Sequence, residues 1–168
     1  LLLKVYKFMN SENNKHVRSI FLENGEKLKF KMGQSLSDDN YLSGSVYYIE
    51  NGLARVIYKV ENKFKTISKI TAGFCVGAVS LIRNSACENI RASTELLTFK
   101  ISDQQFKDLY NNDLRFREFF DSNIYDSEVI HFANYLSKNL LNNKNNIEDL
   151  FKELKNSFHF FFCNLEEI

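Results

Sequence analysis

The sequence lacks several features that would assign it to a specialised class of protein. Its 168 residues include no proline and no tryptophan, and only six glycines. The 22 Lys and Arg residues are balanced by 21 Asp and Glu residues, which gives a formal net charge of +1. Proteins that bind nucleic acids or anionic membranes usually carry an excess of Lys and Arg, and this chain has no such excess. We therefore expect no nucleic-acid partner for this chain.

Long apolar runs are also missing. No stretch approaches the about 18 apolar residues that a membrane-spanning helix needs, so no transmembrane segment is expected. The apolar start, Leu1 to Leu3, is too short for the hydrophobic core of a secretory leader. The first residue is leucine rather than methionine, as expected of a sequence cut from a longer chain.

Cysteine is scarce and widely spaced. Cys75, Cys87 and Cys163 form no C-x-x-C pair, so the sequence predicts neither a zinc site nor a disulfide framework. This usage is typical of a reducing compartment and predicts a cytoplasmic protein.

Residues 17–101 carry all six glycines and most of the alternation typical of short strands. The Asn51-Gly52 pair predicts a hairpin turn, because these residues adopt the positive φ that two-residue turns need. Val60 to Lys63 predicts a weaker second turn. The pattern indicates a series of about eight strands, including Val17–Phe21, Leu28–Met32, Ser45–Glu50, Leu53–Val60, Phe64–Ile70, Ile90–Ser93 and Leu96–Ile101.

After residue 101 the apolar spacing changes to that of helices. Ser102 and Gln105 have the spacing of a capping box, Asp113 is placed to cap a second helix, and Ser127 a third. A last helix is predicted from residue 147. Strands followed by helices favour an α+β architecture. We divide the chain into an N-terminal arm or short helix (1–16), a β-roll (17–101) and C-terminal helices (102–168).

The glycine spacing carries the most specific signal. Gly25-Glu26 and Gly33-Gln34 are followed by the segment Tyr47 to Gly52 and then by the segment Gly73 to Gly77. This order resembles the cyclic nucleotide-binding domain family, whose pattern runs G-E-x-I, G-D, Y-F-I-x-x-G and G-D-x-F-G-E. Five of the six glycines fall at family positions. The resemblance covers about residues 17–101 and extends loosely to residue 141.

The resemblance implies an eight-stranded β-roll (a double-stranded β-helix, or jelly roll) with flanking N-terminal and C-terminal helices. It also implies a short helix at Ala78–Ile82, inside the roll, whose first N–H groups hold the phosphate of a cyclic nucleotide. In the family a glutamate binds the ribose hydroxyl and an arginine pairs with the phosphate. The implied cradle positions are Gly77, Ala78, Val79, Ser80, Arg83, Ala86 and Cys87.

The charged residues of the family pattern are absent at these positions. Ala78 stands where the family has the glutamate, and either Ala86 or Cys87 stands where it has the arginine, depending on the direction of counting. The next residue, Glu88, adds negative charge beside the phosphate site. Arg83 is the candidate replacement cation, whereas Arg91 reads as an outward-facing strand residue. We therefore expect a degenerate cradle and no bound cofactor.

A search for catalytic groups gives no candidate. His16, His131 and His159 are far apart and fit no metal-ligand spacing. Cys87 has no histidine near it in sequence and reads as a small apolar residue. No catalytic residue, no metal and no enzymatic activity are predicted.

The helical part offers two candidate contact surfaces. The stripe Val129, Ala133, Leu136 and Leu140 packs either on the roll or against a second subunit, and both alternatives stay open. The run from Phe158 to Phe162 contains four phenylalanines, too many for one face of a single helix to bury. This run calls for a partner, either a second copy of the chain or an attached protein domain.

The sequence thus predicts a non-catalytic regulatory, sensor or interaction module with the cyclic nucleotide-binding fold, part of a larger regulatory or transport protein. Such a module would not bind cyclic AMP or cyclic GMP in the usual way. The alternative is a cyclic-nucleotide-responsive transcription regulator of the catabolite-activator type without its DNA-binding domain, since residues 142–168 are too few for one.

Overall fold

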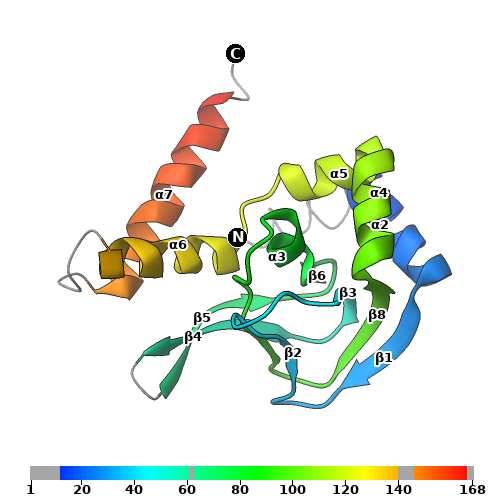
Figure 1. Ribbon diagram of the computed structural model, residues 1–168, viewed down its shortest axis with the longest axis horizontal. Helices are drawn as coiled ribbons and strands as arrows, with labels where there is room; N and C mark the ends of the chain where they lie inside the picture. Colours follow the sequence, from blue (N-terminus) through cyan, green and yellow to red (C-terminus); the bar gives the residue numbers. More distant parts are fainter. Residues whose placement is uncertain (1–11, 61–62, 140–145, 166–168) are drawn as a thin grey trace.

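The chain folds into two antiparallel sheets with helices packed at both ends (Figure 1). The computed structural model describes residues 12–60, 63–139 and 146–165. In the first sheet the strand order is β1-β8-β3-β6, and in the second it is β2-β7-β4-β5. The strands are β1 (Glu26–Phe30), β2 (Ser35–Ser37), β3 (Ser45–Asn51), β4 (Ala54–Val60), β5 (Lys63–Ile70), β6 (Cys75–Val76), β7 (Ile90–Ala92) and β8 (Leu96–Ser102). The predicted α+β architecture is confirmed.

The segment Val17–Phe21, predicted as a strand, is helical. It lies inside helix α2 (Glu12–Asn24). Val17, Ile20 and Phe21 are spaced at i, i+3 and i+4, and this spacing buries all three on one helical face. The β-branched side chains favoured a strand locally, but packing on the neighbouring helices decides the outcome. The first strand therefore begins at Glu26.

The Asn51-Gly52 turn is present, but the predicted hairpin is wrong. This turn joins β3 to β4, which lie in different sheets. Gly52 has a φ of 99°, and a Cβ there would lie 2.3 Å from the carbonyl oxygen of Glu95. The hairpin is formed by β4 and β5, where Val60 pairs with Lys63. Glu61 and Asn62, between these strands, lie outside the described residues.

Two of the three predicted helix caps are confirmed. Ser102 and Gln105 form a capping box at the start of α4 (Asp103–Asn112), and Asp113 caps α5 (Leu114–Asp121) by accepting from the Phe116 N–H. Ser127 was the wrong start, because α6 (Asp126–Asn139) begins before it and buries it. Helices α3 (Ala78–Ile82) and α7 (Ile147–Leu165) complete the described elements.

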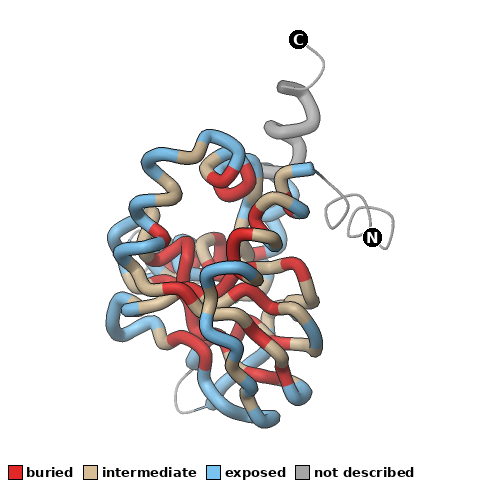
Figure 2. Tube along the Cα trace, turned by 90° about the vertical axis from the view of Figure 1, so that its right-hand side faces the viewer, coloured by how far each residue is buried: buried red, intermediate tan, exposed pale blue. Residues whose placement is uncertain are grey.

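Buried residues gather in the interior of the chain trace (Figure 2), and their apolar side chains form three clusters. The first joins α2, α4 and α5 to the β3 side of the roll and is rich in phenylalanine. The second fills the space between the two sheets. In the third, Val129, Ile130 and Ala133 of α6 and Phe151 of α7 pack on Val56 and Tyr58 of β4. Val129 and Ala133 of the predicted stripe thus pack on the roll.

Among the residues placed by the structure, no helix is both long enough and apolar enough to cross a membrane. Leu140 and the side chains from Phe158 onward lie outside the described part of the chain.

Candidate functional site

The predicted helix Ala78–Ile82 is present, with the same bounds, and Gly77 lies at its N-terminus. Gly77 has a φ of 93°, and a Cβ there would meet the carbonyl oxygen of Ser45 at 2.5 Å. Both facts require glycine at this position. Ala78, Val79 and Ser80 are buried, so the start of α3 lies inside the roll, as the family resemblance implied.

The first N–H groups of this helix point at a carboxylate from the same chain. Glu88 is only 1% exposed. One of its carboxylate oxygens accepts a hydrogen bond from the Gly77 N–H at 3.0 Å, and the other accepts from the Ser80 N–H at 2.9 Å. The first N–H groups of a helix lack partners within the helix and favour an anion, and in α3 the Glu88 carboxylate is that anion.

Ser80 and Cys87 close the cradle beside this carboxylate. The Cys87 N–H donates to the Ser80 hydroxyl at 3.2 Å, and the Cys87 Sγ lies 3.7 Å from the same oxygen. Ala86 and Ala78 contribute no charge. In the part of the chain that the structure describes, no Lys or Arg forms an ion pair with Glu88.

Burial controls the acid–base chemistry of the cradle. It raises the pKa of Glu88, and the N–H groups of Ser80 and Gly77 offset this only in part. Burial also raises the pKa of Cys87 to about 12, with Glu88 adding to the effect. A thiol with this pKa stays protonated near neutral pH, so Cys87 has no character of a nucleophile.

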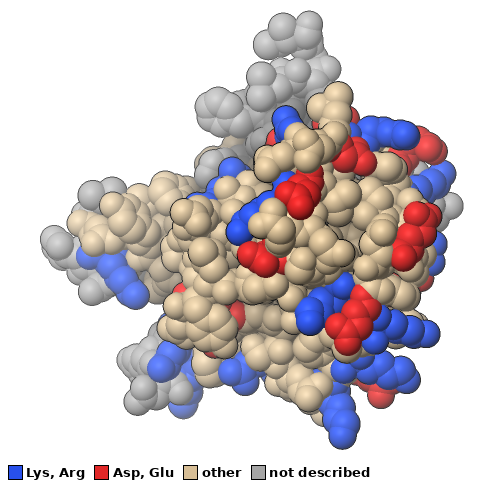
Figure 3. Space-filling view, turned by 45° about the vertical axis from the view of Figure 1, so that its right-hand side comes forward, with Lys and Arg blue, Asp and Glu red and all other residues tan. Residues whose placement is uncertain are grey.

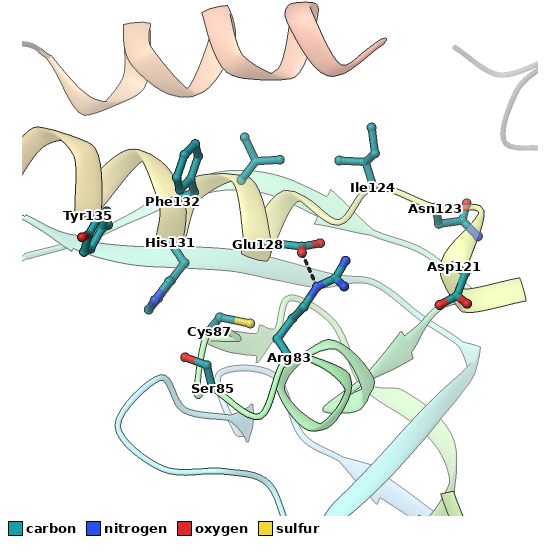
Figure 4. A pocket seen from close by; sticks show the side chains of 11 residues that line it. Arg83, Ser85, Cys87, Asp121, Asn123, Ile124, Glu128, His131, Phe132 and Tyr135 are labelled. Carbon is teal, nitrogen blue, oxygen red and sulfur yellow. Dashed lines mark hydrogen bonds and ion pairs between the residues drawn. The ribbon is translucent and has the colours of Figure 1, made fainter. Parts of the chain in front are cut away.

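Arg83, the candidate replacement cation, is engaged elsewhere. It lies at the C-terminal end of α3 and forms an ion pair with Glu128 of α6 (Figure 4). Its side chain is 55% exposed. The other candidate, Arg91, lies over the ring of Phe64, with its guanidinium carbon 4.7 Å from the ring centre. Neither arginine forms a hydrogen bond or ion pair with Glu88 or Ser80.

A cavity of about 490 Å³ lies between the loop after α3 and helix α6. In Figure 4, the side chain of His131 points from α6 toward Ser85 and Cys87 of the loop, whereas the ring of Phe132 points away from them. Phe132 and Tyr135 of α6 also line the cavity. The sequence did not identify these three α6 residues as cavity residues, because they lie off the predicted apolar stripe and belong to no local motif. The further lining residues are Arg83, Asp121, Asn123, Ile124, Glu128 and Val129.

The described residues hold no cluster of three or more His, Cys, Asp or Glu side chains able to bind a metal ion. His16 instead contacts Asp113 at 2.6 Å, where it supports the cap of α5. The arrangement provides a closed anion cradle and an adjoining cavity, without an identified nucleophile.

A family model matches this chain. The family model described as the cyclic nucleotide-binding domain matches residues 27–113, more than half of the chain. No curated protein sequence matches.

Solved structures share the fold at low sequence identity. The Thermus thermophilus catabolite activator protein is 12% identical with a TM-score of 0.56, and the match covers 68% of this chain and 55% of that one. The regulatory subunit of a cAMP-independent protein kinase A from Trypanosoma brucei is 16% identical with a TM-score of 0.56, covering 78% and 46%. The c-di-GMP responsive regulator CLP of Xanthomonas campestris is 17% identical with a TM-score of 0.53, covering 76% and 59%.

This chain therefore spans about half the length of these three proteins. The glycine at the start of α3, the two sheets and the family match over the roll agree with one another. The chain belongs to the cyclic nucleotide-binding domain family.

Proposed function

We propose that this chain is a non-catalytic regulatory or interaction module that does not hold a cyclic nucleotide in its phosphate cradle. The observation that carries the proposal is the position of Glu88, whose carboxylate accepts from the Gly77 and Ser80 N–H groups. The N–H groups that would receive a phosphate are already engaged.

Two further features act against a bound phosphate. The missing charge-assisted contacts, at Ala78 and at Ala86 or Cys87, are each worth about 1.5–3 kcal/mol in a typical site. Their loss alone corresponds to a weakening of affinity by about a hundredfold to ten-thousandfold. A phosphate would also have to displace a buried carboxylate of the same charge, and no cation lies in the cradle to neutralise either group.

The finer features of the family fit this proposal. We infer a jelly roll from the strand orders 1-8-3-6 and 2-7-4-5, in which every strand pair is antiparallel. The buried free thiols of Cys75 and Cys87 fit a reducing location such as the cytoplasm. Lys and Arg side chains lie among Asp and Glu side chains over the face shown in Figure 3. This mixed charge argues against a nucleic acid as the partner of that face, because a nucleic acid binds to continuous positive charge.

We also propose that the C-terminal helices contact a second copy of the chain or an attached domain of a larger regulatory protein. Ile124, Phe132 and Tyr135 remain exposed beside the cavity, at 37%, 40% and 56% of their surface. Exposed apolar side chains gathered in one place are typical of a contact surface.

Isothermal calorimetry with cyclic AMP and cyclic GMP tests the cradle directly. We expect no binding heat and no rise in the melting temperature at micromolar nucleotide. Saturable micromolar binding would refute the proposal and favour the alternative, a nucleotide-responsive transcription regulator of which this chain is the sensing part.

A further inference from the structure

Three cations lie side by side across the second sheet, on the face turned away from the apolar core. Arg91 of β7 pairs directly with Arg55 of β4, and Arg55 pairs with Lys69 of β5. The neighbours of Arg91 and Arg55 along their strands are buried in the core, so both arginine side chains point outward. Adjacent strands are about 4.8 Å apart, and the Cα atoms of these three residues therefore lie within about 10 Å across the sheet.

This row, which we call the basic row (Arg91, Arg55 and Lys69), is not neutralised by the chain itself. None of its members forms an ion pair within the described residues, although ten ion pairs occur there. The two acidic residues after β2 are engaged otherwise, because Asp38 accepts from Asn40 and Asp39 from Asn89. Like charges directly opposite one another on neighbouring strands repel. The repulsion is relieved when an anion bridges them.

The two guanidinium groups are also held in place. Arg91 stacks over Phe64, and the Nε atoms of both Arg91 and Arg55 are shielded from solvent without a hydrogen-bond acceptor. The stems are thus packed, and the outer nitrogen atoms remain as the donors available to a ligand. Pre-positioned guanidinium groups bind carboxylates in a paired, planar geometry, and they lose little freedom on binding.

We propose that the basic row and the neighbouring Phe64 bind an acidic segment of a protein partner through its carboxylates. Phe64 is 50% exposed and offers an apolar contact beside the charges. Three cations can pair with the few carboxylates of a short acidic peptide. A protein that binds DNA can make about 6–10 phosphate contacts, and a chain of net charge +1 has no large excess of cations for that number. This proposal goes beyond the proposed function and does not depend on it, since the basic row lies on the outer face of the sheet and not in the cradle.

Fluorescence anisotropy with a labelled peptide of six glutamates and a central phenylalanine tests the proposal on the full chain. We expect saturable binding that weakens as salt is raised, and an about tenfold loss of affinity in the double variant Arg55→Gln, Arg91→Gln. The matched control, Lys27→Gln with Lys31→Gln, removes the same charge from exposed positions in β1 of the other sheet and directly after it, and should bind like the parent chain.

The variant Arg55→Lys, Arg91→Lys keeps the charge but loses the fork of the guanidinium, and it should bind more weakly than the parent. It serves as the test if the glutamine variant does not fold, as judged by its circular dichroism. An equal loss in the Lys27 and Lys31 control would overturn the proposal. Tighter binding of a single-stranded oligonucleotide or of phosphatidylserine vesicles than of the peptide would overturn it as well.

Discussion

The carboxyl group of Glu88 accepts from two buried N–H donors and pairs with no cation in the described part of the chain. Removing it should therefore change the free energy of unfolding. In Glu88→Ala the donors of Gly77 and Ser80 lose their acceptor, and each unsatisfied buried donor costs about 1–3 kcal/mol. The loss is partly offset because the variant no longer buries a carboxylate. We expect the free energy of unfolding in urea to fall by about 1–3 kcal/mol. Glu95→Ala, at an exposed position, should change it by less than about 0.5 kcal/mol.

The pH dependence of stability should also report on Glu88. Burial raises its pKa above the ordinary value of 4.5, so the folded chain binds this proton more tightly than the unfolded chain. The stabilisation from this group is therefore fully present below the unfolded pKa and is lost as the pH rises through the folded pKa. Unfolding free energies of the parent chain and Glu88→Gln, measured between about pH 4 and about pH 8, should differ most in favour of the parent at the acidic end. A difference that does not vary with pH would contradict the raised pKa.

Gly77 should tolerate substitution less well than another glycine with similar backbone geometry. Gly33 also has a positive φ, of 86°, but a Cβ there meets nothing within 4 Å. Gly33→Ala therefore measures backbone strain alone, about 1 kcal/mol. In Gly77→Ala the new Cβ would also meet the backbone oxygen of Ser45, so its melting temperature should fall further than that of Gly33→Ala. Equal losses would show that the cradle adapts to the side chain.

The residues of the cradle were predictable from sequence only in part. The motif glycines placed α3, and the absence of charge at Ala78 and Ala86 was readable directly. Glu88 was noted as a nearby negative charge, but its role was not predictable. Its side chain returns to the start of α3 from eight to eleven residues further along the chain. That return depends on the loop after α3, whose path no local pattern specifies.

At the scale of elements, α6 is attached to the roll by two kinds of contact. Ile130 is 3% exposed in the cluster with Val56 and Tyr58, whereas the Arg83–Glu128 pair is half-exposed. Deleting a buried isoleucine side chain to alanine costs about 2–5 kcal/mol, and an exposed ion pair contributes about 0–1 kcal/mol.

We therefore expect Ile130→Ala to lower the unfolding free energy by about 2–4 kcal/mol and Arg83→Gln to lower it by less than about 1 kcal/mol. Hydrogen exchange locates the effect, because amides of α6 and α7 should lose protection in Ile130→Ala while those of α2 keep it. A larger effect of Arg83→Gln would mean that the ion pair, and not the apolar cluster, holds α6 on the roll.

Two predictions about whole elements were wrong for one physical reason: contacts distant in sequence decide what the local pattern leaves open. The segment Val17–Phe21 is short enough for its apolar residues to fit a strand or a helix, and only the contacts with α5 and β8 decide. The Asn51-Gly52 pair specified a turn correctly, but a turn does not specify which sheet receives the next strand. A helix cap involves residues only three positions apart, so the local sequence contains the information for it. Two of the three predicted caps, at Ser102 and Asp113, were therefore correct.

At the scale of the whole molecule, a chain of contacts connects the cradle to the C-terminal helices. The ion pair of Arg83 with Glu128 links the end of α3 to α6, and α6 packs on α7 (Figure 1). A change at the start of α3 can therefore reach α7 through α3 itself, the Arg83–Glu128 ion pair and the packing of α6 on α7. A regulatory module transmits a signal only if its ligand binds two states with different affinity. With Glu88 in the cradle, the partner proposed for the C-terminal helices, and not a nucleotide, is the ligand expected to supply that difference.

Self-association tests the proposed partner surface. If a second copy covers the exposed apolar side chains of α6, sedimentation equilibrium should show a dimer whose population rises with concentration and depends little on salt. Phe132→Lys with Tyr135→Lys places two charges at the contact and should shift the chain to monomer while leaving its circular dichroism spectrum unchanged. Met32→Lys, at a residue 75% exposed on the β1–β2 connection, is the matched control and should remain dimeric. A parent chain that stays monomeric at high concentration would exclude the second copy and leave an attached domain as the partner.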